Sequence, residues 1–516
     1  MKIFSFSPFG YEGALVSVEV DLRRGIPAVD MVGLADGAVK ESRERMRSAI
    51  RNSGFDFPPE RVLISLSPAD LKKEGAGFDL AIALAVLSAQ NENSEENKPL
   101  IDEKILIMGE LELSGKIRAV RGVHGAVSTA LEAGISMCIV PEDNRAEAMQ
   151  ADRIKVFGAR NLKDAYSALF KRELFLENQD FSLEGLNDND EYENIDGVLF
   201  PKVERSLDFI DIEGQERLTR ALQIAAGGHH NLITYGSPGC GKTLSLQRYI
   251  SLLPCLTLEE AQSVTRIHSI AGLLPQGKSL IRKPQFRQPH QTASIEGMCG
   301  GGARCMPGEI SLSHNGVLFL DEAAEFKTSV LQMLRVPLES GAITISRAGR
   351  STSYPARFQL LLATNPCPCG FYGSKEKICL CSASSVEQYW KKFSGPLLDR
   401  IDIRVKAEEF KSKSVSSSEL RKDIARATRV QRERQNKYNA YLTPEEVEKY
   451  CILSEEARKL LSTETIRHTF SSRAEAACKK LSRTIADMRG SSVIEKEDMQ
   501  EAIELRKDEG ALYTDF

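Results

Sequence analysis

One short stretch, residues 236–243, constrains the fold of this chain more than any other. It reads Gly236-Ser237-Pro238-Gly239-Cys240-Gly241-Lys242-Thr243 and matches the pattern G-x-x-x-x-G-K-[ST] in full. The glycines let backbone N–H groups surround phosphates, the lysine reaches the β and γ oxygens, and the Thr hydroxyl can ligate Mg²⁺. The motif requires a strand before it and a helix after it, and residues 231–235 read as a short strand. We therefore expect an α/β nucleotide-binding domain that takes ATP and Mg²⁺.

A second motif lies downstream. Residues 316–320 are an apolar run typical of a buried strand, and Asp321 and Glu322 follow it directly. In an open parallel sheet, ligands bind beyond the carboxyl ends of the strands. Asp321 is predicted to hold Mg²⁺, and Glu322 to polarise the attacking water.

Two further segments complete the expected catalytic set. Residues 358–364 form another apolar run that ends at Asn365, whose amide can hydrogen-bond a γ-phosphate or the attacking water. Arg400 lies in a polar turn after residues 395–399, and a guanidinium near a γ-phosphate stabilises the charge of the transition state. An Arg in such a turn is more often a surface salt-bridge partner, so this prediction depends on the preceding motifs.

Taken together, these motifs resemble those of AAA+ ATPases, in particular the magnesium-chelatase-like branch and, within it, the YifB/ComM family. Residues 286–294, 307–322, 365–370 and 394–402 carry the resemblance, which covers nearly the whole chain. It departs from the family pattern at His290-Gln291, where members tend to have two histidines, and at Ala323-Ala324, where Leu-Pro is usual.

The resemblance implies a ring-forming motor, usually hexameric, and for the ComM members a DNA helicase that drives branch migration in natural transformation. It also implies that Arg400 serves the nucleotide of a neighbouring subunit. Arg473, in a helix of the C-terminal lid, would sense the γ-phosphate in its own subunit, with Arg483 as the competitor for that role.

Four segments are predicted. Residues 1–170 resemble the proteolytic domain of Lon, an α+β domain, but residues 73–79 contain no serine, so we expect a scaffold without the nucleophile. Residues 171–204 are predicted to be an acidic, flexible linker. Residues 205–407 form the AAA+ core, in which residues 208–216 resemble the segment that borders the adenine pocket, and residues 408–516 form a helical lid. The charged stretch 419–438 is predicted to be an exposed helix.

Charge distribution bears on DNA binding. The net charge is −4, but residues 266–304 carry six Lys/Arg against one acid, and residues 411–437 carry nine against three. We interpret 265–315 as an insertion with a mobile loop and 342–352 as a hairpin. The candidates for DNA contact in these segments are Arg287, His290, Arg304, Arg347 and Arg350.

The cysteines cluster at one place. Cys367, Cys369, Cys379 and Cys381 form two close pairs that suit tetrahedral Zn²⁺, with free thiols or a redox pair as alternatives. The chain has neither an apolar run of membrane-spanning length nor a secretory signal at residues 1–6, and we expect a cytoplasmic protein.

Two functions remain open. The first is a DNA motor, and the second is a chelatase-like ATPase that remodels a protein partner.

Overall fold

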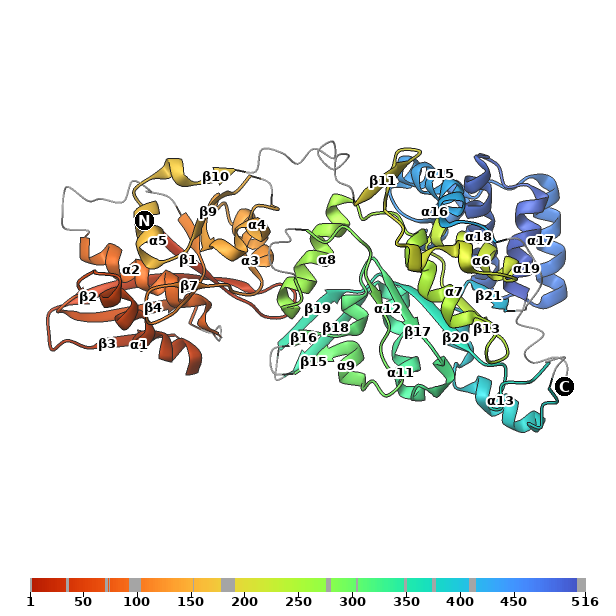
Figure 1. Ribbon diagram of the computed structural model, residues 1–516, viewed down its shortest axis with the longest axis horizontal. Helices are drawn as coiled ribbons and strands as arrows, with labels where there is room; N and C mark the ends of the chain where they lie inside the picture. The colour runs from red at the N-terminus through yellow and green to blue at the C-terminus, as the bar shows by residue number, and fades with distance from the viewer. Residues whose placement is uncertain are drawn as a thin grey trace.

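The computed structural model describes residues 2–33, 37–69, 73, 75–91, 104–151, 153–177, 191–274, 280–302, 305–347, 350–373, 377–407 and 414–507. Two lobes lie side by side, the N-terminal domain and the ATPase domain with its helical lid (Figure 1). Within these ranges, no helix is long and apolar enough to cross a membrane.

The N-terminal domain is built on a mixed sheet of eight strands in the order β10-β9-β8-β5-β1-β2-β4-β3. Its strands are β1 (Lys2–Ser7), β2 (Ala14–Arg23), β3 (Val29–Val32), β4 (Arg61–Ser67), β5 (Lys104–Ile107), β8 (Met137–Pro141), β9 (Lys155–Ala159) and β10 (Leu176–Glu177), with β6 (Glu110–Leu111) and β7 (Ile117–Arg118) as a separate ribbon. Its helices are α1 (Gly37–Asn52), α2 (Asp79–Asn91), α3 (Val123–Glu132), α4 (Arg145–Ala148) and α5 (Leu162–Ala168).

Helix α2 forms the centre of this domain. Its residues from Leu80 to Leu87 are all buried, as expected for a helix that is apolar on every side. On α1, Met46 and Ile50 are buried, while the side chain of Val39 lies outside the described part. Beneath them, the buried carboxylate of Asp79 pairs with Arg45 (2.8 Å), so a charge inside the domain is neutralised.

The described ends of the predicted linker are ordered rather than flexible. Leu176–Glu177 adds a strand to the N-terminal sheet, and β11 (Tyr192–Ile195) pairs with β12 (Val198–Pro201). Residues 178–190 lie outside the described part. The hairpin is held by its acids, because Glu193 pairs with Arg421 and Asp196 with Arg429 of the lid.

The ATPase domain has a parallel sheet of five strands in the order β14-β17-β20-β13-β21. These strands are β14 (Phe286–Arg287), β17 (Val317–Leu320), β20 (Gln359–Thr364), β13 (Leu232–Tyr235) and β21 (Ile403–Lys406). Around them lie α6 (Glu216–Gly228), α7 (Lys242–Arg248), α8 (Leu258–Ala271), α9 (Ile295–Cys299), α10 (Glu309–Leu312), α11 (Thr328–Met333), α12 (Arg335–Ser340), α13 (Ala383–Lys391) and α14 (Gly395–Leu398).

The predicted insertion 265–315 needs correction. Phe286–Arg287 is the edge strand of the central sheet and pairs with Val317–Leu318, so this segment belongs to the core. A small ribbon of β15 (Gly300–Gly301) and β16 (Met306–Pro307) follows it. The hairpin predicted over residues 342–352 is confirmed, since β18 (Ala342–Arg347) pairs with β19 (Arg350–Pro355).

Over residues 414–507, the described part of the lid, the α-helices are α15 (Ser417–Gln435), α16 (Pro444–Tyr450), α17 (Glu455–His468), α18 (Ser472–Arg489) and α19 (Lys496–Lys507). The prediction that 419–438 is an exposed helix is wrong. Helix α15 packs against α6 and α18 and buries Leu420, Ile424 and Ala427. Arg421 is only 1% exposed, because its guanidinium pairs with Glu193 and donates to the Ser251 carbonyl. Charge alone misled the prediction, since buried partners neutralise it.

The two lobes meet at α8, on the side of the ATPase lobe that faces the N-terminal domain (Figure 1). Tyr11 lies beneath the Arg266 guanidinium at 4.5 Å and edge-on to Tyr354 at 5.9 Å. Ser269 accepts from the backbone N–H of Gly122 (3.0 Å) and donates to the buried carboxylate of Glu147.

Candidate functional site

The phosphate-binding loop lies between β13 and α7, as the motif requires. All four residues of β13 are buried, and Gly239 (φ 86°) and Gly241 (φ 80°) take left-handed backbone conformations that favour glycine. Lys242 Nζ donates to the carbonyls of Gly236 (2.7 Å) and Ser237 (2.9 Å). Burial lowers the pKa of Lys242, so an anionic ligand nearby would restore the stability of its charged form.

The acidic pair lies next to this loop. Thr243 Oγ1 donates to Asp321 Oδ1 at 3.2 Å, which places a hydroxyl and a carboxylate where they can share one hard cation. Glu322 adopts φ 48°, a strained conformation for a residue other than glycine, and its N–H donates to Asp321 Oδ1 (3.0 Å). These oxygens fit Mg²⁺, and the backbone turn leaves the exposed Glu322 side chain beside them.

Asn365 joins the same point from β20. Its Oδ1 accepts from Lys242 Nζ at 3.4 Å. Because β13, β17 and β20 are parallel neighbours, their carboxyl ends bring Lys242, Asp321 and Asn365 together across more than 120 residues of sequence.

A recess adjoins the loop. A cavity of about 360 Å³ is lined by Phe209, Ile212, Gln215 and Val415, among others. Gln215 Nε2 donates to the Cys240 carbonyl at 2.7 Å, so the wall of this recess is tied to the phosphate-binding loop. Its position agrees with the adenine-pocket role predicted for residues 208–216.

The carboxylate of Glu339, which no sequence motif indicated, brings Arg400 and Arg473 together. Glu339, near the end of α12, accepts from the guanidinium of Arg400 and from that of Arg473 (2.9 Å). The pair lowers the pKa of Glu339, chiefly through the hydrogen bond from Arg400. Arg483 is fully buried and bonded to Asp487 and to the carbonyls of residues 491 and 492, so it supports the lid rather than a ligand.

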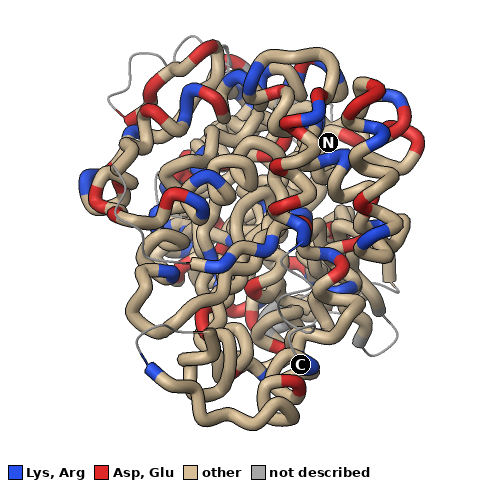
Figure 2. Tube along the Cα trace, turned by 90° about the vertical axis from the view of Figure 1, so that its right-hand side faces the viewer, with Lys and Arg blue, Asp and Glu red and all other residues tan. Residues whose placement is uncertain are grey.

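The DNA candidates differ in how they are held. Arg287 forms a two-point ion pair with Glu309 (2.7 and 2.8 Å), so its partly exposed guanidinium already has a partner within the chain. His290 is exposed and bonds to Thr292. Arg347 and Arg350 pair through the backbone at the end of the β18–β19 hairpin, and their side chains lie outside the described part, as does Arg304. In Figure 2, Lys/Arg and Asp/Glu positions are interleaved along the chain on the side shown.

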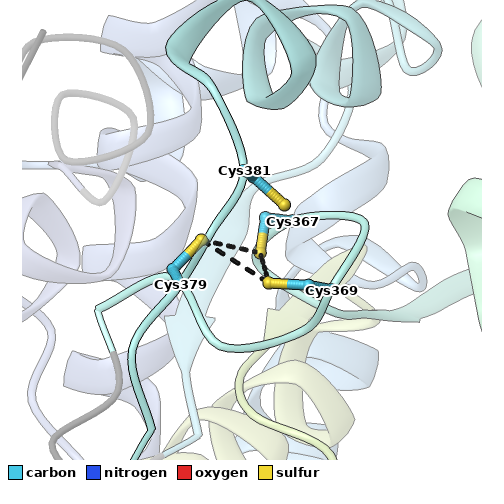
Figure 3. A group of neighbouring side chains, drawn as sticks. All are labelled: Cys367, Cys369, Cys379 and Cys381. Atoms are coloured by element: carbon cyan, nitrogen blue, oxygen red, sulfur yellow. Dashed lines mark hydrogen bonds between the residues drawn. The ribbon is translucent and has the colours of Figure 1, made fainter.

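The four predicted cysteines converge. Their ligand atoms all lie within 4.8 Å of one another, and Cys367 Sγ is 3.3 Å from Cys369 Sγ and 3.7 Å from Cys379 Sγ (Figure 3). A backbone hydrogen bond from Phe371, with help from the neighbouring thiols, lowers the pKa of Cys369 to about 6. Burial and the neighbouring thiols raise the pKa of Cys379 to about 12 and also raise that of Cys381, so of these three cysteines only Cys369 favours thiolate, the form that binds metal.

No Ser, Thr or Cys is among the described residues that line the cavity of about 250 Å³ between the Lon-like domain and the ATPase lobe. Gly75, Ala76 and Gly77 form part of its wall.

The strand order, the phosphate-binding loop, the acidic pair and Asn365 define a P-loop ATPase of the AAA+ type. Residues 208–415 match the family described as magnesium chelatase, subunit ChlI, residues 414–506 match its C-terminal part, and residues 18–144 match subunit ChlI of Mg-chelatase.

Relatives are similar over nearly the whole chain. The protein named YifB of Escherichia coli (strain K12) is 40% identical over 509 residues, which cover 96% of this chain and 95% of that protein. Competence protein ComM of Haemophilus influenzae is 36% identical over 513 residues, 98% of this chain and 97% of that protein. The chain belongs to the YifB/ComM family of magnesium-chelatase-like AAA+ proteins. Lon protease of Clostridioides difficile is 29% identical over 142 residues, 26% of this chain and 17% of that protein.

Proposed function

We propose that this protein is a DNA-dependent motor that assembles as a ring and drives branch migration when single strands recombine. The observation that carries the proposal is the convergence of Lys242, Thr243, Asp321 and Asn365 at one edge of the parallel sheet. Similarity to a competence protein over almost the full chain supports DNA as the substrate.

In this proposal, ATP lies with its phosphates on residues 236–243 and its base in the recess beside Gln215. Thr243 and Asp321 would hold Mg²⁺, which would supply positive charge to offset that of the phosphates. Glu322 orients and polarises the attacking water, and Asn365 fixes the position of the γ-phosphate relative to that water.

The arginines are assigned to the subunit interface. Arg400 and Arg473 share Glu339, so we propose that both act on the same nucleotide, the one bound by the adjacent subunit. This differs from the expectation that Arg473 acts within its own subunit. Glu339 would hold the two guanidinium groups ready and release them when a γ-phosphate competes for them.

The DNA-contacting set is narrower than the sequence predicted. Arg287 is committed to Glu309, and the α15 arginines 421, 426, 429 and 434 pair with acids inside the chain. We therefore propose that DNA contact rests on His290, on Arg304 and on the hairpin residues Arg347 and Arg350. Phosphate contacts of this kind weaken steeply with salt.

A protein-remodelling ATPase is the second candidate. The internal pairing of the α15 arginines favours it, because this pairing removes much of the positive charge that DNA would require. The net charge of −4 points the same way.

The test is the rate of ATP hydrolysis with no DNA and with single-stranded, duplex and four-way-junction DNA. Glu322→Gln provides the blank. Stimulation by one DNA structure supports the motor and identifies its substrate. A rate that is indifferent to every DNA contradicts it and favours a protein partner, to be captured with the ATP-trapped Glu322→Gln variant.

A further inference from the structure

The four-cysteine cluster has the sulfur spacing of a tetrahedral metal site rather than of a disulfide. With Zn–S bonds of about 2.3 Å, the sulfurs of a tetrahedral site lie about 3.8 Å apart. Three pairs among Cys367, Cys369 and Cys379 are 3.3, 3.5 and 3.7 Å apart, and Cys381 completes the group (Figure 3). A disulfide would need about 2.05 Å.

In the segment that carries Cys379 and Cys381, the apolar side chains face solvent instead of packing against the protein. Ile378 is 87% exposed and Leu380 is 91% exposed, while the cysteines between and after them face the cluster. Burying an Ile or Leu side chain is favourable, so a shift by one residue would be expected if hydrophobic packing alone decided the register. A thiolate–metal bond supplies the missing reason for this register, since metal binding contributes directly to folding free energy.

The cluster is joined to the nucleotide site at both of its ends. Asn365 and Cys367 are separated only by Pro366, whose carbonyl accepts from Trp390 Nε1 at 3.0 Å. Trp390 belongs to α13, which begins two residues after Cys381, and Tyr389 of the same helix bonds Thr364 Oγ1 at 2.8 Å. Helix α13 therefore holds the residues on both sides of Asn365.

The loop between the cysteines also touches the phosphate-binding loop. A Cβ placed on Gly370 would lie 2.7 Å from Pro238 Cγ and 3.8 Å from Asn365 Cγ, so the backbone of Gly370 packs against both. Gly373, in the same loop, has nothing within 4 Å of such a Cβ. Both glycines have positive φ, 82° and 70°.

We infer that Cys367, Cys369, Cys379 and Cys381 bind one structural Zn²⁺, and that this zinc knuckle positions Asn365 and the Pro238 segment for ATP hydrolysis. The inference rests on the proposed ATPase activity for its second half. Zinc loss would release Pro366 from α13 and Gly370 from the phosphate-binding loop, so hydrolysis would fall while ATP still bound through Lys242.

The first experiment measures metal content, Trp390 fluorescence and basal ATP hydrolysis on the purified full chain. Trp390 is the chain's single tryptophan, so its emission reports on the Pro366 contact. We expect zinc at one ion per chain. Removing it with a mercurial reagent and a chelator should red-shift the emission and lower kcat about 10- to 100-fold, and excess free thiol, which strips the mercurial from the cysteines, followed by Zn²⁺ should restore both.

A glycine pair separates positioning from folding. Gly370→Ala should keep its zinc and lose about tenfold or more in kcat, because its methyl group displaces Pro238 or Asn365. Gly373→Ala carries the same backbone strain without the clash and should stay within about twofold of the wild-type kcat.

Three outcomes would overturn the inference in distinguishable ways. Four reactive thiols without zinc in the native protein would remove the metal site. Zinc whose removal changes neither kcat nor Trp390 emission would remove the positioning role, as would equal rates for the two glycine variants. Failure of the DNA motor leaves the test intact, because metal content, fluorescence and basal hydrolysis require no DNA.

Discussion

Lys242 and Glu322 divide the work of the nucleotide site between binding and water activation. Lys242 reaches the carbonyls of the loop and the Asn365 amide, the place where β and γ oxygens would lie. Glu322 is exposed beside Asp321 on a strained turn. Such strain persists where the surroundings impose it, which is common at catalytic positions.

The two residues should therefore fail differently when changed. Lys242→Ala is expected to weaken ATP binding at least about tenfold, because it removes the positive charge that would bind the phosphates. Glu322→Gln should bind ATP normally and lose about 10²–10⁴-fold in kcat, because the amide cannot act as a base. Equilibrium binding of a fluorescent ATP analogue, measured beside the hydrolysis rate, checks both. Equal loss of binding in the two variants would contradict these roles.

His124 illustrates a buried group that the fold holds neutral. Neither of its ring nitrogens has a hydrogen-bond partner in the described part of the chain, and burial, with a smaller effect of Arg266, lowers its pKa to about 4. An unfolded His titrates near 6.5, so the unfolded chain takes up the proton first as the pH falls. The stability contributed by neutral His124 is complete above about pH 6.5 and is lost toward pH 4, with about 2 kcal/mol lost at pH 5.

His124→Leu should consequently raise stability by about 1 kcal/mol at pH 7, because two unsatisfied polar atoms are removed. It should also reduce the loss of stability between pH 7 and pH 5. Urea unfolding midpoints at the two pH values measure both effects. His314→Leu is the matched control: the pKa of His314 is also about 4, but its Nδ1 accepts from the Arg357 N–H (3.1 Å), so this change should destabilise at pH 7. A destabilised His124→Leu at pH 7 would contradict the argument.

At the scale of elements, α15 is where local sequence and tertiary structure disagree most. Its composition is that of a solvated helix, yet Arg421 is buried under the β11–β12 hairpin, with its guanidinium 5.0 Å from the Phe200 ring centre. Acids of the presumed linker supply the partners. The hairpin and the helix thus form one unit, in which acidic residues of the hairpin neutralise basic residues of α15.

This unit predicts unequal costs for neighbouring cations. Arg421→Ala should destabilise the ATPase domain by about 3 kcal/mol, because it breaks a buried pair and empties the space over Phe200. Lys422→Ala, at the next, exposed position, should cost less than about 0.5 kcal/mol. Thermal unfolding of the two variants compares them. Similar costs would mean that the Arg421 pairing is unimportant.

At the scale of the whole molecule, the Lon-like domain is attached to α8 and to the β18–β19 hairpin of the ATPase domain. Tyr11 contacts Arg266 of α8 and Tyr354 of the β18–β19 hairpin, and its N–H donates to Thr352 Oγ1 (3.0 Å). Ser269 of α8 bonds Gly122 and Glu147. If the hairpin shifts during the ATP cycle, these contacts would therefore displace the N-terminal domain as well.

Removing the Tyr11 side chain should loosen the two lobes without unfolding either. Tyr11→Ala is expected to widen the particle in small-angle scattering, because it loses the ring contacts to Arg266 and Tyr354. Tyr11→Phe keeps the ring and loses only the hydroxyl contact to Ser263 (3.2 Å), so it should behave as wild type. Unchanged scattering for Tyr11→Ala would show that the Ser269 contacts suffice.

The sequence by itself determined the nucleotide site, since its motifs are short local patterns that end strands of one parallel sheet. The positions of Lys242, Thr243, Asp321 and Asn365 followed from spacing and the rule that carboxyl ends share an edge. The hairpin 342–352 and the buried α2 helix were predictable for the same reason, because periodicity is local.

Only the tertiary structure decided which charged side chains form ion pairs within the protein. Two of these ion-paired groups join elements that are distant in the chain: Glu339 with Arg400 and Arg473, and Glu193 with Arg421. A third, Glu309 with Arg287, spans 22 residues. The contact of Gly370 with Pro238 is of the same kind. No local pattern encodes such pairs, because their free energy arises from burial and complementarity once the chain has folded.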